Sequence, residues 1–124
     1  RIPDPGRFEL RLMDGSANPY LLQASVLAAG LDGLKNKINP GKPLDCNMYE
    51  DHEKYPDLPK LPDELDQSLE KLKNNKDMNE AFGKETINSY IKLRTSEIKE
   101  FKQKESFDKT KAITRWERDN TLDC

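Results

Sequence analysis

Three charged side chains near the start of the chain alternate with apolar ones. Arg7, Glu9 and Arg11 stand two residues apart, and the positions between them are apolar. In an extended chain such residues share one face, spaced about 7 Å apart. A carboxylate is a ligand for hard divalent cations, and guanidinium groups bind anionic oxygens through paired hydrogen bonds. The pattern alone favours an ordinary solvated strand face, and an anion held beside a metal ion remains the alternative.

An element with a period of two residues must position these charges. The alternation predicts a β-strand over about residues 7–13, with its charged face opposite an apolar face. The apolar face carries Phe8, Leu10 and Leu12.

A helix is predicted directly after this strand, over residues 18–38. Asn18 is a good N-cap, and Pro19 suits the first helical position, where no N–H is needed. The helix is apolar on nearly every face, which is typical of a helix buried inside a protein. The rest of the chain offers little to cover it, so the sequence indicates that partner structure is missing.

The remainder divides into a loop and a helical region. Residues 39–62 are rich in proline and predict a long connection, in which the single histidine, His52, is expected to be exposed. Residues 63–120 carry apolar stripes at helical spacing and predict several amphipathic helices, including one from Lys84 to about Lys104 and one over 107–118. We therefore expect a mainly α-helical α+β fragment with one N-terminal strand.

Composition excludes several classes of function. Lys and Arg number 21 against 23 Asp and Glu, with both signs interspersed, so we expect no nucleic-acid partner. No apolar stretch approaches the ~20 residues that span a bilayer, so no membrane partner is expected. Cys46 and Cys124 lie far apart with no metal-binding spacing, which predicts free thiols and a cytoplasmic location.

Several stretches together resemble the glutamine synthetase family. Residues 7–21, RFELRLMDGSANPYL, are similar to the family pattern R-x-E-x-R-x-x-D followed by NPYL. Residues 29–38, AGLDGLKNKI, and 47–50, NMYE, are similar to the end of the following helix and to the next loop. Residues 1–3, RIP, look like the end of the family's RSAxxRIP segment. The similarity is close over the first 50 residues and looser beyond them.

The resemblance implies a fold and a chemistry. Residues 1–124 would be the C-terminal part of the catalytic domain, with the active-site strand within 1–14. The implied reaction uses ATP to convert glutamate into γ-glutamyl phosphate, from which ammonia displaces phosphate to form glutamine. The implied cofactor is Mg²⁺ or Mn²⁺, and the implied assembly is a ring of identical subunits.

The resemblance also assigns roles to single residues. Glu9 matches a metal ligand, and Arg11 matches the arginine that contacts glutamate or its acyl phosphate and so acts in catalysis. Arg1 and Arg7 match arginines that bind ATP phosphates. Tyr49 matches the position adenylylated in some enteric members and is a candidate for modification. The other metal ligands and the nucleotide pocket lie upstream in the family, so the fragment alone is expected to be inactive.

Some features depart from the common family pattern and leave alternatives open. The spacing from Arg1 to Arg7 is shorter, and Leu12-Met13-Asp14 stands where many members have Phe-Pro-Asp. These differences resemble a divergent, type III-like branch. One alternative is a glutamate–amine ligase of the same family, similar to γ-glutamylmethylamide synthetase. Another is a non-enzymatic helical interaction module.

Overall fold

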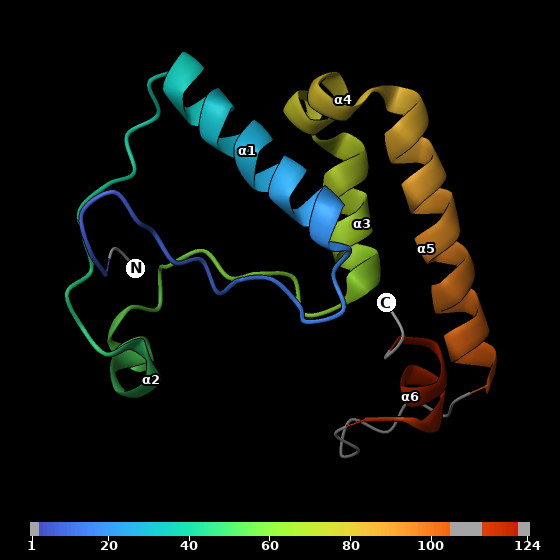
Figure 1. Cartoon of the computed structure of the whole chain (residues 1–124). Coiled ribbons are helices and arrows are strands. Elements are labelled where there is room, and N and C mark those ends of the chain that lie inside the picture. Colours follow the sequence, from blue (N-terminus) through green and yellow to red (C-terminus); the bar gives the residue numbers. More distant parts are fainter. Residues whose placement is uncertain (1–2, 105–112, 122–124) are drawn as a thin grey trace.

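The described part of the chain is mainly helical, with long irregular segments before α1 and between α1 and α3 (Figure 1). The computed structural model describes residues 3–104 and 113–121. Its helices are α1 (Pro19–Lys35), α2 (Met48–Asp51), the 3-10 helix η1 (His52–Lys54), α3 (Leu65–Asn74), α4 (Lys76–Phe82), α5 (Lys84–Lys104) and α6 (Arg115–Thr121). None of these helices is long and apolar enough to cross a membrane.

The predicted β-strand over residues 7–13 is not confirmed. Within the described ranges the backbone forms one isolated antiparallel bridge, between Asp4 and Arg7, and no strand. A strand needs a neighbouring strand to bond its N–H and C=O groups. The described residues supply no such neighbour, so the alternating segment runs as unpaired extended chain.

Helix α1 begins where the sequence predicts. The side-chain oxygen of Asn18 accepts hydrogen bonds from the backbone N–H of Tyr20 at 3.1 Å and of Leu21 at 3.0 Å. These bonds satisfy two of the donors that a helix leaves without partners at its start. At the other end, the N–H of Asn36 bonds the carbonyl of Asp32 at 2.9 Å.

The prediction that this helix is buried is wrong for the chain as it stands. No residue of α1 is buried, and Tyr20 is 82% exposed. Helix α4 contacts α1, but a helix of seven residues cannot enclose one of 17 that is apolar on nearly every side. The sequence-based expectation that this helix lacks cover is confirmed.

Helices α3, α4 and α5 form the best-packed part of the chain. In Figure 1, α3 and α5 lie side by side and α4 joins them at one end. Leu69 on α3 and Ile87 on α5 are the buried apolar residues of the described chain. Near the other end, Lys102 pairs with Asp66 at 3.0 Å.

Local sequence signals separate these helices. The side chain of Asn75 accepts a bond from the N–H of Met78 at 2.9 Å and so caps α4. Gly83 then takes a φ of 80°, which glycine adopts without strain, and α5 begins at the next residue. The predicted helix from Lys84 to about Lys104 is confirmed.

The C-terminal helix of the described residues begins at Arg115, because Ile113 and Thr114 are not helical. Residues 107–112 of the helix predicted over 107–118 lie outside the described residues, and α6 covers Arg115–Thr121. Trp116 packs edge-on against Phe101 of α5, with ring centroids 5.6 Å apart. Such an arrangement is a favourable geometry for two aromatic rings.

Candidate functional site

A tight turn positions the first of the three charged residues. Asp4, Pro5, Gly6 and Arg7 form it, with the N–H of Arg7 donating to the Asp4 carbonyl at 3.2 Å. Proline at the second position and glycine with a φ of 76° at the third are typical of a type II turn. The turn places the Arg7 guanidinium 2.6 Å from the Asp4 carboxylate.

Glu9 and Arg11 form a second ion pair. The Arg11 Nε donates a hydrogen bond to the Glu9 carboxylate, as expected for residues two apart in an extended segment. This hydrogen bond, and then the negative charge of Glu9, raise the pKa of Arg11 above its already high value. A smaller contribution comes from Tyr49, so the loop after α1 approaches this segment. Arg11 therefore carries its positive charge at every working pH.

The structure divides the predicted site residues between these two pairs. Arg7 pairs with Asp4, whereas Glu9 pairs with Arg11. The guanidiniums of both pairs are well exposed, and Glu9 is half-buried. Arg1 lies outside the described residues.

Asp14 forms local hydrogen bonds in the connection between the charged segment and α1. Its carboxylate accepts bonds from the backbone N–H of Ser16 at 2.8 Å and from the Ser16 hydroxyl at 2.5 Å. These two hydrogen bonds lower the pKa of Asp14 below its usual range. Sequence reasoning matched Asp14 to the family pattern but did not predict this role, which the Asp-x-Ser spacing signals.

Neither of two surface hollows on the described chain is lined by the charged segment. Both hollows occur along the helical region. The first lies along α3, and the second lies around α4. Their linings are Asp66, Gln67, Glu70, Lys71, Asn74 and Asn75 for the first, and Lys73, Asn74, Lys76, Asn79, Glu80 and Lys84 for the second.

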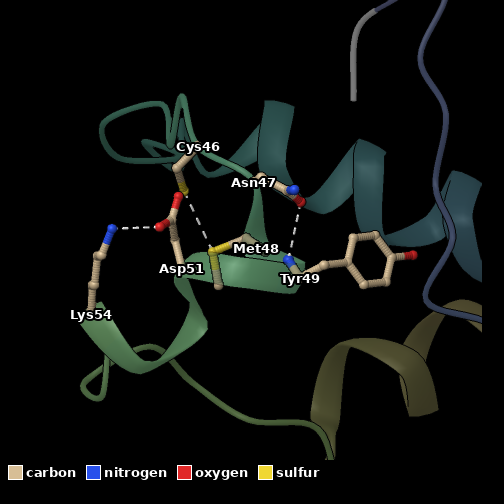
Figure 2. A network of polar contacts seen from close by, with 6 residues as sticks. All are labelled: Cys46, Asn47, Met48, Tyr49, Asp51 and Lys54. Atoms are coloured by element: carbon tan, nitrogen blue, oxygen red, sulfur yellow. Dashed lines mark hydrogen bonds and ion pairs between the residues drawn. The ribbon is translucent and has the colours of Figure 1, made fainter.

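Tyr49 lies on the short helix α2, in the loop after α1. Figure 2 shows its ring projecting away from α2, and the side chain of Asn47 caps that helix by accepting from the N–H of Tyr49 at 3.2 Å. Where α2 continues into η1, Lys54 pairs with Asp51 at 2.6 Å. Tyr49 is 89% exposed, so its phenol is accessible to a modifying enzyme.

Two further groups in this loop were not predicted. The thiol of Cys46 lies 3.6 Å from the sulfur of Met48, and a hydrogen bond between Cys46 and Tyr55 raises the pKa of the Tyr55 phenol. His52 is exposed, as predicted. Over the described ranges, no three or more His, Cys, Asp and Glu side chains are grouped to hold a metal ion.

Comparison with known proteins gives a consistent result. The family model described as "Glutamine synthetase, catalytic domain" matches residues 1–120. A glutamine synthetase of Rhizobium meliloti is 43% identical over 123 residues, which cover 99% of this chain and 26% of that protein. Glutamine synthetases of Vibrio cholerae and Escherichia coli are each 40% identical, over 78% and 77% of this chain and 22% and 21% of their own lengths.

These matches cover only part of each relative. The chain spans about a quarter of the length of the curated relatives it matches. No solved structure matches it. The family match extends to residue 120, well beyond the first 50 residues where the sequence motifs are closest.

Proposed function

Because the chain belongs to the glutamine synthetase catalytic-domain family, we propose that it contributes one edge of the active site of a glutamate–ammonia ligase. The reaction is ATP-dependent and proceeds through γ-glutamyl phosphate. The observation that carries the proposal is the alternating segment Arg7, Glu9 and Arg11, which is accessible and stands directly before α1. The segment would supply one carboxylate and two guanidinium groups that stay positively charged. Phosphoryl transfer depends on such groups to stabilise the negative charge of the phosphates.

Glu9 would supply a ligand to Mg²⁺ or Mn²⁺. Its carboxylate oxygens are donors of the kind that these hard ions prefer. The described part of the chain offers this carboxylate without a grouped set of other donors, so further ligands have to come from elsewhere in the enzyme. The ion, when bound, neutralises charge on the phosphates of ATP.

Arg11 would bind glutamate or its acyl phosphate, and Arg7 would bind ATP phosphates together with Arg1. A guanidinium presents donors in a planar fork that matches the oxygens of carboxylate and phosphate. Both described arginines are well exposed in their present ion pairs, with Asp4 and with the half-buried Glu9, and ion pairs screened by solvent contribute little stability. Each arginine can therefore turn to a substrate anion at small cost.

Tyr49 is the proposed site of covalent regulation. Its exposed ring stands on the loop that approaches Arg11, so a nucleotidyl group added to the phenol would introduce negative charge near the active-site edge. The residues that follow, Glu50, Asp51 and His52, differ from the enteric pattern.

The chain alone is proposed to be inactive. In the family that this chain belongs to, the nucleotide pocket and the other metal ligands would lie upstream, so the chain would present one edge of the site. In an assembled enzyme, ATP, glutamate and ammonia would be its substrates, a ring of identical subunits its assembly and the cytoplasm its location.

A chimaeric enzyme tests the proposed function. This chain replaces the matching quarter of the Rhizobium meliloti glutamine synthetase, and glutamine formation is assayed with ammonia and, in parallel, with methylamine. We expect the chimaera to favour ammonia, and we expect Glu9→Ala to lower kcat on the order of 10²–10³-fold, because a group that stabilises developing charge is lost.

The matched control is Glu50→Ala, which removes an exposed glutamate from α2. This variant should retain the activity of the parent chimaera, and both variants should give the same circular dichroism spectrum. Full turnover by the Glu9→Ala enzyme would refute the role of the charged segment.

A further inference from the structure

The Arg7 guanidinium already binds an anion that the chain itself supplies. Its Nη2 donates to the Asp4 Oδ2 at 2.6 Å, which makes this a charge-assisted hydrogen bond. The side chains of Arg7 and Asp4 are 65% and 66% exposed, so solutes reach both partners. Water screens such a pair, and a competing anion can therefore open it at small cost.

The backbone turn around this pair does not use the Asp4 carboxylate. Its hydrogen bond runs from the Arg7 N–H to the Asp4 carbonyl at 3.2 Å, and Gly6 supplies the φ of 76° that the turn needs. The isolated bridge between Asp4 and Arg7 is likewise a backbone feature. A substitution confined to the Asp4 side chain therefore changes the charge beside Arg7 and leaves the turn in place.

A carboxylate and a phosphate compete for the same donors of an arginine. The planar fork of a guanidinium matches the oxygens of either anion, so Arg7 must release Asp4 before it can turn its donors fully to a phosphate. The released Asp4 carboxylate stays within the same four-residue turn, and its negative charge repels the bound phosphates. Asp4 therefore opposes phosphate binding in two ways, by occupying Arg7 and by repulsion.

We propose that Asp4 is a positioning residue that holds the Arg7 guanidinium until nucleotide displaces it and so lowers the affinity of the site for the phosphates of ATP. This inference rests on the proposed function, which assigns Arg7 to those phosphates. It adds a carboxylate that works against binding to the groups that favour it. The size of the effect is set by an exposed ion pair, which corresponds to about a two- to fivefold change in affinity.

A titration of the 124-residue chain with inorganic tripolyphosphate tests the inference. The NMR signal of the Arg7 Nε–H reports binding at this guanidinium. We expect Asp4→Asn to lower the Kd for tripolyphosphate by about two- to fivefold, because the amide carries no charge to hold Arg7 or to repel the anion. Asp4→Glu restores the carboxylate and should bind like the parent chain.

The matched control is Asp51→Asn, which makes the same change in net charge and opens a similar pair, Asp51 with Lys54 at 2.6 Å. This control should leave the Kd at Arg7 unchanged. Equal Kd values for the parent and Asp4→Asn overturn the inference, as does equal tightening in both asparagine variants. Weaker binding by Asp4→Asn, or no shift at Arg7 in any variant, also overturns it.

Kinetics of the chimaera supply a second readout. Asp4→Asn should lower the KM for ATP by the same factor while kcat stays at the parent value, a split that a merely structural role would not produce. An unchanged KM for ATP in an active chimaera overturns the inference. The titration with tripolyphosphate needs no turnover, so an inactive chimaera counts against the proposed function and leaves the titration to decide the role of Asp4.

Discussion

Arg7, Glu9 and Arg11 each have a nearby partner of opposite charge, and this governs how they can act. The Asp4–Arg7 pair sits in a tight turn, and the Glu9–Arg11 pair joins residues two apart, so both form from local sequence. Solvent screens such pairs, and their net contribution to stability is small. They keep the charges in place without committing the arginines to one partner.

Ser16→Ala is expected to raise the pKa of Asp14 toward its ordinary value, because the Ser16 hydroxyl is the main group that lowers it. Asp14 titrates below that value in the folded chain. Its hydrogen bonds therefore stabilise the fold above the ordinary pKa, and this stabilisation is lost as pH falls through the lowered one.

The measurement is an NMR titration of the Asp14 carboxyl carbon. Ser25→Ala, a change of the same kind within α1, serves as the control and should leave this titration unchanged. Identical titration of Asp14 in the parent and in Ser16→Ala would contradict the role of the hydroxyl.

At the scale of single elements, capping side chains decide where the helices lie. Asn18, Asn47 and Asn75 each accept a backbone N–H at a helix start, and Gly83 separates α4 from α5. These signals act within a few residues and do not depend on distant packing. They could therefore be found in the sequence for α1 and for the helix Lys84–Lys104.

Asn18→Ala is expected to destabilise α1 by about 1 kcal/mol, the usual cost of losing a helix cap. Because no residue of α1 is buried, packing cannot compensate, and the first turn should fray. Amide exchange of Leu21 and Leu22 measures this as faster exchange.

Asn39→Ala is the matched control, since its side chain accepts from the N–H of Gly41, beyond the helix. Unaltered exchange at the start of α1 in Asn18→Ala would show that the cap contributes nothing there.

At the scale of the whole molecule, stability is concentrated where α3 meets α5. Leu69 and Ile87 are 6% and 5% exposed, whereas the other large apolar side chains of the described ranges keep some contact with solvent. Loss of apolar area from water is the main favourable contribution to folding. The α3–α5 contact is therefore expected to unfold last, and the segment before α1 to exchange most freely.

Ile87→Ala is expected to destabilise the α3–α5 unit by about 2–4 kcal/mol, because it removes buried methyl groups and leaves a cavity. Urea unfolding followed by circular dichroism at 222 nm measures the change. Leu93→Ala removes a comparable side chain from the exposed face of the same helix, and its effect should stay within about 0.5 kcal/mol. Equal midpoints for the two variants would show that Ile87 is not part of a core.

The sequence by itself determined the local features of this chain and its family. The start of α1 after Asn18 follows from capping within a few residues, the helix Lys84–Lys104 follows from its apolar stripe, and the family follows from ordered motifs. The predicted strand over 7–13 and the burial of the helix over 18–38 needed distant partners, and neither is realised among the described residues.

Only the tertiary structure decided which side chains meet. Nothing local identifies Leu69 and Ile87, rather than the other stripe residues, as the buried pair. Nor did spacing reveal that Arg7 would turn to Asp4 while Glu9 holds Arg11. The physical reason is that burial and strand pairing depend on surfaces distant along the chain or outside it, whereas caps and turns are completed by near neighbours.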